Sequence, residues 1–290
     1  MHVISIHPGT WASLQSQRGR LPHALLLVGQ RGLGKFALAQ AFAKSLLCEQ
    51  PLDGGHFCDE CLACNWFEHD NHPDFRLLQP QAMVEEGEVD GGRKKASQQI
   101  TIDQVRALDS FFNVGTHRAG VKIIVVNPAD AMNRNTANAL LKSLEEPAPG
   151  TLFLMVSSEP LRLLPTIRSR CQVVPVAVPS TAAAEAALAA DGIRQPARWL
   201  ALAGGSPGLA SELAAADEGG WLDVLTRRLA AKGELDPTGL AADLEKIARE
   251  SRGKLALKSV VEAMQKWLVD LTLASNGLPI RYFLAQQATI

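Results

Sequence analysis

HALLLVGQRGLGKFALAQAFAKSLL, residues 23–47, is the stretch that decides the fold of this chain. It begins with a short apolar run that ends in glycine, which is typical of a strand buried on both faces of a parallel sheet. Its middle part, GQRGLGK (residues 29–35), fits the phosphate-binding loop pattern G-x-x-x-x-G-K. The last part has apolar residues at helical spacing. Strand, glycine loop and helix follow in the order that this motif requires.

The following sequence alternates in the same way. Apolar runs predict strands near residues 75–78, 121–126 and 151–158, and amphipathic patterns predict helices over 101–114 and 134–147. Such alternation indicates a parallel sheet covered on both faces, so the fold class is α/β.

After residue 178 the pattern changes to Ala- and Leu-rich helical segments without a convincing strand. We therefore expect three domains: an α/β domain over residues 1–178, a small helical domain over 179–211 and a second helical domain over 212–290.

Bulk composition excludes several classes of protein. The net charge of −1 over 290 residues gives no overall attraction for nucleic acid, so any DNA contact has to be local or supplied by partners. The first thirty residues lack the order of a signal peptide, and the longest apolar runs are too short to span a bilayer. We expect a cytoplasmic protein that does not enter a membrane.

The phosphate loop keeps its cradle and lacks a metal ligand. Gly29, Gly32, Gly34 and Lys35 retain the backbone and the lysine that bind phosphates in such loops. Phe36 stands where a Ser or Thr hydroxyl coordinates Mg²⁺. Whether ATP still binds is left open by the sequence.

The tip of the strand near residue 126 carries no carboxylate. ATPases of this type place a magnesium-binding acid there and a second acid that positions the attacking water, but this chain has Asn127 and Pro128. Asp130 is expected to cap a turn, and Ser157 and Ser158 to cap the end of their strand. Because both halves of the metal site are missing, we expect no autonomous catalysis.

Four of the five cysteines lie close together: Cys48, Cys58, Cys61 and Cys64. In a cytosolic chain such a cluster favours a metal over disulfides. Four thiolates close a tetrahedral structural zinc site, which leaves no open position for catalysis. An iron–sulfur site expects another cysteine where Glu68 stands, so zinc is the favoured ion. Three nearby histidines are spare ligands that the site does not need: His56, His69 and His72.

Three motifs in this order carry a resemblance: GQRGLGK, ANALLKSLEEP (residues 137–147) and SSEPLRLLPTIRSRC (residues 157–171). With the cysteine cluster, they resemble the clamp-loader branch of the AAA+ family over roughly residues 1–215. The resemblance implies a RecA-like AAA+ domain with a zinc module at residues 48–64, a helical lid, and a helical collar for oligomerisation. The collar is short by the measure of that family, so its truncation is left open.

Motor subunits of this family keep the magnesium ligands and place a phosphate-sensing arginine where this chain has Pro207. The chain therefore resembles the subunit of the bacterial DNA polymerase III clamp loader that does not hydrolyse ATP. The resemblance implies a hetero-oligomer with gamma/tau motor subunits and a delta subunit. It would act on the sliding clamp and on primer-template DNA through the complex, as an accessory to a DNA-directed DNA polymerase, a nucleotidyltransferase.

Ser169-Arg170-Cys171 matches the Ser-Arg-Cys motif of clamp loaders. The resemblance implies that Arg170 is an arginine finger, offered in trans to the γ-phosphate of a neighbouring motor subunit, with Ser169 part of the same motif. Arg168 is not the motif position. The alternative is an ordinary surface arginine beside a buried Cys171.

Two rival functions remain open. The first is an ATP-hydrolysing gamma/tau-like motor subunit, against which Phe36, Asn127 and Pro128 argue. The second is a zinc-dependent nucleic-acid-binding module, against which the near-neutral charge argues.

Overall fold

The computed structural model describes residues 3–84, 96–116, 120–217, 220–231, 236–250 and 255–287. The chain divides into two compact units. We call residues Val3–Gln30 and Gly34–Ala177 the α/β unit, and Arg31–Leu33 with the chain from Val178 onward the helical unit. The expected further boundary near residue 211 stays a prediction.

The α/β unit contains a five-stranded sheet in the order β2-β3-β4-β1-β5, with every pair of neighbours parallel. The predicted parallel α/β fold is therefore confirmed. The strands are β1 (Ala24–Val28), β2 (Phe75–Leu78), β3 (Lys122–Val126), β4 (Thr151–Ser157) and β5 (Gln172–Pro175).

Four of these strands were expected, and β5 was missed. Val173 in β5 is 52% exposed, and only Val174 of this short edge strand is buried. A strand with so little apolar surface in the core has no strong period in its sequence.

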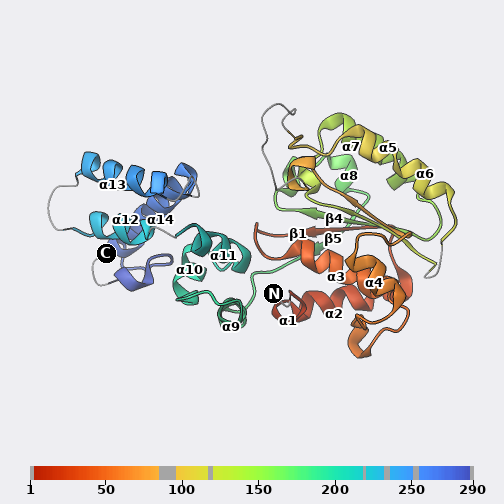
Figure 1. The fold of residues 1–290 in the computed structure, drawn as a ribbon, viewed down its shortest axis with the longest axis horizontal. Coiled ribbons are helices and arrows are strands. Elements are labelled where there is room, and N and C mark those ends of the chain that lie inside the picture. The colour runs from red at the N-terminus through yellow and green to blue at the C-terminus, as the bar shows by residue number, and fades with distance from the viewer. Residues whose placement is uncertain are drawn as a thin grey trace. The chain divides into compact units, whose positions relative to one another are not determined.

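Helices cover both faces of the sheet (Figure 1). One face packs under four helices: α5 (Ile102–Arg106), α6 (Leu108–Asn113), α7 (Arg134–Glu145) and α8 (Pro165–Arg168). The other face carries α3 (Lys35–Leu47), against which three helices pack: α1 (Val3–Ile6), α2 (Pro8–Ser16) and α4 (Leu62–Glu68). The three central strands β3, β4 and β1 are almost entirely buried and mostly apolar, because helices cover both of their faces.

Local capping sets where the predicted helices begin and end. Thr101 caps α5 in a capping box with Gln104, which resolves the choice between Thr101 and Asp103. The predicted helix over 101–114 divides at Ala107 into α5 and α6. Helix α7 ends at Glu145, shortly before Pro147, as expected from the inability of proline to continue a helix.

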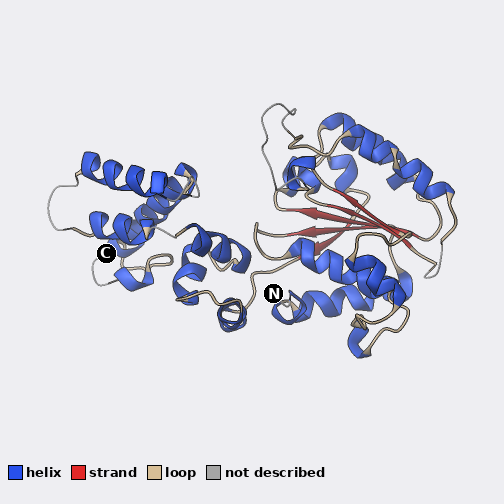
Figure 2. Ribbon diagram, in the orientation of Figure 1, coloured by secondary structure: helices blue, strands red, loops and turns tan. Residues whose placement is uncertain are grey.

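The described part of the helical unit from Val178 onward contains helices and no strand (Figure 2). One hydrophobic core runs through it around Trp199, Trp221 and Trp267. Its helices are α9 (Thr181–Ala190), α10 (Pro196–Leu202), α11 (Pro207–Ala216), α12 (Trp221–Leu229), α13 (Pro237–Glu250) and α14 (Leu257–Ser275). None of the helices that the structure describes is long and apolar enough to cross a bilayer.

We expect Phe153→Ala to lower the free energy of unfolding by about 3–5 kcal/mol, because it leaves a cavity in the middle of the sheet. Phe153 is fully buried in β4 and its ring lies 6.2 Å from that of Phe112. Urea unfolding followed by circular dichroism measures the change. Val173→Ala on the exposed edge is the control, with an expected change within about 0.5 kcal/mol. Equal losses in the two variants would contradict this account of the core.

Candidate functional site

The phosphate loop lies between β1 and α3, as the motif predicts. Gly32 and Gly34 both have φ of +78°, a conformation that side chains with a Cβ atom rarely adopt. Gly34 is the N-cap of α3, so the helix begins at Lys35. The backbone therefore forms the sharp turn into a helix N-terminus that binds anions in phosphate loops.

The ammonium group of Lys35 is held by the chain itself. It donates hydrogen bonds to the carbonyl oxygens of Gly29 (2.8 Å) and Gln30 (2.5 Å) and to the hydroxyl of Ser158 (3.0 Å). These acceptors match the three N–H donors of a lysine. Lys35 is only 4% exposed, and this burial lowers its pKa to about 8 although Asp130 acts to raise it. Phosphate binding by Lys35 would require it to exchange at least one of these contacts.

The tip of the loop, Arg31–Leu33, belongs to the helical unit and contacts the start of α11 there. The Ser206 hydroxyl donates to the carbonyl of Arg31, and the N–H of Gly208 donates to that of Gly32, both at 2.8 Å. A Cβ atom on Gly208 would lie 2.7 Å from the Gly32 carbonyl oxygen, so this approach requires glycine. Pro207 is the first residue of α11, where proline fits well.

The end of β3 presents no acid at the positions where magnesium ligands were sought. Asn127 is buried and Pro128 follows it, and neither side chain can ionise. The carboxylate of Asp130 accepts the N–H of Ser158 at 3.2 Å, so it caps the end of β4. The negative charge of Asp130 also acts to raise the pKa of Lys35.

The two serines after β4 have different roles. Ser157 accepts the N–H of Glu159 at 3.2 Å and caps the strand end, as expected. The expectation was wrong for the Ser158 hydroxyl, which binds Lys35 instead. This contact depends on the order of the strands, which the sequence did not predict: β1 and β4 are neighbours, and Val28 pairs with Ser157. Strand ends that pair in parallel lie at the same edge of a sheet.

Arg170 lies on the surface between α8 and β5. Its side chain is 34% exposed and pairs with Glu145 at 2.6 Å, while a second nitrogen donates to the carbonyl of Thr166 at 2.9 Å. Ser169 binds the same carbonyl through its hydroxyl. Cys171 contacts the sulfur of Met155, and burial raises the pKa of its thiol to about 11, so it is a packing residue rather than a reactive one.

The four clustered cysteines converge after α3. Their sulfur atoms all lie within 4.8 Å of one another, with separations of 3.6 Å between Cys48 and Cys58, 3.9 Å between Cys48 and Cys61, and 4.0 Å between Cys58 and Cys64. A tetrahedron with metal–sulfur bonds of about 2.3 Å has edges of about 3.8 Å. The cluster can therefore hold a metal ion.

Backbone N–H groups donate hydrogen bonds to three of the four sulfur atoms. The N–H groups of Cys58, Cys61 and Cys64 donate to the sulfur atoms of Cys48, Cys58 and Cys61 respectively, at 3.3–3.4 Å. Burial acts to raise the pKa of Cys61, but the hydrogen bond from the Cys64 N–H and those from other neighbours outweigh it and lower the pKa to about 6. Cys61 therefore favours the thiolate form, which is the form that binds metal, whereas burial raises the pKa of Cys48 and Cys64.

The three spare histidines do not join the cluster that the structure describes. His56 stacks on Trp11, with ring centroids 5.6 Å apart, and His69 contacts the carbonyl of Asn65. His72 is buried, with its ring against that of Trp66. The group that lies close enough together to hold a metal ion therefore consists of cysteines alone, and their role as zinc ligands stays a prediction.

Side chains from α2 and α3 fix the module to the rest of the α/β unit. The indole N–H of Trp11 donates to the carbonyl of Gly54 at 3.1 Å, in the excursion between the first two cysteines. Lys44 of α3 is 4% exposed and forms ion pairs with Asp59 and Glu68 on either side of Cys61 and Cys64. These contacts fix the segment that carries the cysteines to α2 and α3.

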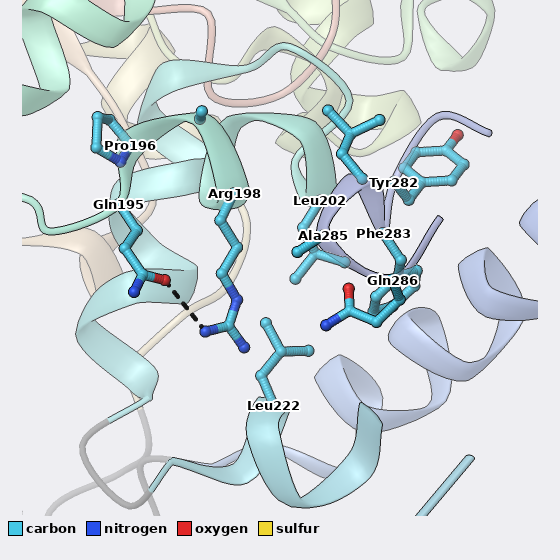
Figure 3. Close-up of a pocket in the computed structure, with 11 residues that line it drawn as sticks. Gln195, Pro196, Arg198, Leu202, Leu222, Tyr282, Phe283, Ala285 and Gln286 are labelled. Atoms are coloured by element: carbon cyan, nitrogen blue, oxygen red, sulfur yellow. Dashed lines mark hydrogen bonds between the residues drawn. The ribbon is translucent and has the colours of Figure 1, made fainter. Parts of the chain in front are cut away.

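A cavity of about 310 Å³ lies in the helical unit, and its lining includes none of the site residues that the sequence singled out (Figure 3). Arg198 is on its wall, with Gln195 accepting a hydrogen bond at 3.4 Å, and its guanidinium also pairs with Asp223 at 2.6 Å. The remaining wall is mostly apolar and includes Leu222 and Phe283. Because its charged group already has a carboxylate partner, this cavity offers no clear chemistry for phosphate or metal.

Lys35 predicts a dependence of stability on pH. Its pKa is about 8 in the folded chain and 10.5 ordinarily, so between these values the unfolded chain binds more protons and stability rises with pH. Below pH 8 both states are protonated, and the whole penalty for burying the charge is present. We therefore expect the urea midpoint of the wild type to rise relative to that of Lys35→Met as the pH increases from 8 to 10.5. A constant difference between the two midpoints would rule out this titration.

Comparisons with known proteins agree with these observations. A family model described as "DNA polymerase III, delta subunit" matches residues 7–180. A protein of Pseudomonas aeruginosa named DNA polymerase III subunit delta' is 42% identical over 207 residues, which cover 70% of this chain and 58% of that protein. Its Escherichia coli counterpart of the same name is 34% identical over 225 residues, 76% of this chain and 62% of that protein.

The chain thus spans about three fifths of the length of these two relatives. A solved structure described as a DNA polymerase III gamma subunit-related protein of Thermotoga maritima is 18% identical, with a TM-score of 0.45, and the match covers 82% of this chain and 78% of that one. The family model matches more than half of the chain, and relatives named delta' match most of it. The chain belongs to the DNA polymerase III delta subunit family, among its delta' members.

Proposed function

We propose that the chain is a delta'-type subunit of the clamp loader of the replicative DNA polymerase III, and that it helps to place the sliding clamp on primed DNA without hydrolysing ATP. The observation that carries the proposal is a well-formed phosphate loop from which the magnesium ligands are absent. The positions that should supply them hold Phe36, Asn127 and Pro128.

Loss of hydrolysis follows from the chemistry that these positions lack. Transfer of a γ-phosphoryl group needs Mg²⁺ to neutralise the developing charge, and the protein normally holds that ion with a hydroxyl and a carboxylate. No acid replaces Asn127, since Asp130 is engaged with the Ser158 N–H. Lys35 is bound to the carbonyls of its own loop. The loop then serves as a rigid turn of the scaffold.

The remaining parts of the assignment follow from the family. The α/β unit would be a RecA-like AAA+ domain, and the helical unit would supply the lid over residues 179–211 and the collar over 212–290. The partners would be gamma/tau motor subunits and a delta subunit in a cytoplasmic hetero-oligomer. Sliding clamp and primer-template DNA would be reached through the complex, as the net charge of −1 also favours.

Arg170 would then act outside its own chain, as an arginine finger on ATP bound to a neighbouring motor subunit. A guanidinium can stabilise the charge that develops on the transferred phosphoryl group, which is worth about 10³–10⁵ in rate in other nucleotide hydrolases. The exposure of Arg170 at the surface of the α/β unit supports this role.

We expect Arg170→Ala to fold and assemble normally while the ATP turnover stimulated by clamp and primed DNA falls, by as much as about 10³-fold at the site that Arg170 serves. Phosphate release by the reconstituted complex measures the effect. Arg168→Ala is the matched control and should retain turnover, because Arg168 is not the motif position. Normal turnover in the Arg170→Ala complex would remove the trans role.

The cysteine module would hold zinc. Its four ligands are all sulfur, their spacing suits a tetrahedral ion, and the sequence lacks the further cysteine that an iron–sulfur site expects at Glu68. Bound zinc would cross-link the segment after α3, and with four protein ligands it would leave no position for a reacting water.

We expect the purified chain to contain about one zinc ion, and Cys61→Ser to lose it, because a closed site needs all four thiolates. Elemental analysis measures the metal, and thermal unfolding measures the accompanying loss of stability. Cys171→Ser is the matched control: it removes a cysteine outside the cluster and should keep the zinc. Iron in the wild type, or full zinc in Cys61→Ser, would overturn the assignment.

A further inference from the structure

The guanidinium of Arg170 has two close acceptors in different parts of the chain, besides a longer contact of 3.5 Å with the hydroxyl of the adjacent Ser169. One of its terminal nitrogens lies 2.6 Å from a carboxylate oxygen of Glu145, the last residue of α7. The other donates to the carbonyl of Thr166 in α8 at 2.9 Å. Two acceptors on two terminal nitrogens fix both the position and the plane of this group.

We propose that Glu145 is a positioning residue for Arg170, which sets the direction in which the guanidinium leaves the surface. This inference rests on the proposed trans role of Arg170. A guanidinium has five N–H donors, and contacts with Glu145 and Thr166 leave donors on the remaining edge. Arg170 can therefore keep both contacts and still present hydrogen bonds to an incoming phosphate.

The support behind both partners is rigid. Leu144, next to Glu145, is 1% exposed, and Ile167, between Thr166 and Arg170, is fully buried. Both belong to the core on one face of the sheet. Helices α7 and α8 are also in contact. A displacement of either partner would therefore disturb packed side chains, whereas an unsupported arginine samples many rotamers at the surface.

The neighbouring acid provides a natural comparison. Glu146 is exposed and follows directly after α7, but no ion pair of Glu146 occurs within the ranges that the structure covers. The two glutamates carry the same charge and are adjacent in the sequence, but only Glu145 contacts Arg170. A role of Glu145 that comes only from negative charge near α7 would therefore be shared by Glu146.

The first test uses the complex reconstituted with motor subunits, clamp and primed DNA. We expect Glu145→Ala to lower kcat for ATP roughly tenfold, since a misplacement of about 1 Å can cost up to about 100-fold. KM for ATP should not change, because the motor subunit binds the nucleotide in its own phosphate loop. Glu145→Gln keeps an acceptor and should fall between, and Glu146→Ala should match the wild type.

The outcomes separate this inference from the proposed function. If Arg170→Ala has normal turnover, the trans role fails and the inference fails with it. If Arg170→Ala is impaired and Glu145→Ala retains the wild-type kcat, only the inference fails. Faster turnover in Glu145→Ala would also overturn it, because Glu145 would then restrain Arg170 rather than position it.

A second measurement uses the isolated chain and does not depend on activity. Phenylglyoxal modifies accessible guanidinium groups, and peptide mass mapping gives the rate at Arg170. We expect Glu145→Ala to modify faster at Arg170 than either the wild type or Glu146→Ala. Partly exposed ion pairs contribute little to stability, so all three chains should fold alike. Equal rates would show that the contact does not restrain Arg170 in solution and would overturn the inference.

Discussion

Parallel pairing of β1 with β4 is the constraint on which the site depends. It brings the phosphate loop, which follows β1, and Ser158, which follows β4, to one edge of the sheet. Lys35 then finds acceptors both in its own loop and on the neighbouring strand end. The loop is therefore held in shape by the chain's own hydrogen bonds, and no phosphate is needed to satisfy the N–H donors of the lysine.

The phosphate loop keeps the backbone shape of its motif but lacks the side chains that would bind magnesium. A nucleotide hydrolase of this type needs a hydroxyl directly after its lysine and an acid at the end of the strand that corresponds to β3, and Phe36 and Asn127 supply neither. The glycines that form the turn are nevertheless present, and Gly32 also allows close contact with the backbone around Gly208. Such a loop is consistent with a scaffold that keeps the geometry of its family while its proposed chemical contribution, Arg170, lies elsewhere on the surface.

Side-chain contacts also fix the cysteine-containing segment to α3 and α2. The cysteine module follows this helix directly, and the buried Lys44 on α3 pairs with acids on both sides of the later cysteines. Trp11 of α2 donates to the backbone of the module from a third direction. These contacts fix the segment after α3 to the α/β unit even though it contributes no strand.

Features encoded over short distances were determined by the sequence alone: the strand, loop and helix around residues 23–47, the absence of a hydroxyl at Phe36 and of an acid at Asn127, and the cluster of four cysteines. Each depends on residue types at fixed spacing, and local geometry converts that spacing directly into structure. The contacts of Lys35 with Ser158 and of Arg170 with Glu145 were decided only by the tertiary structure. They join side chains from elements whose proximity follows from the order of strands in the sheet and the packing of helices on it. The edge strand β5 was also decided there, because an exposed strand leaves little apolar pattern in its sequence and forms through the hydrogen bonds that its neighbour β1 offers.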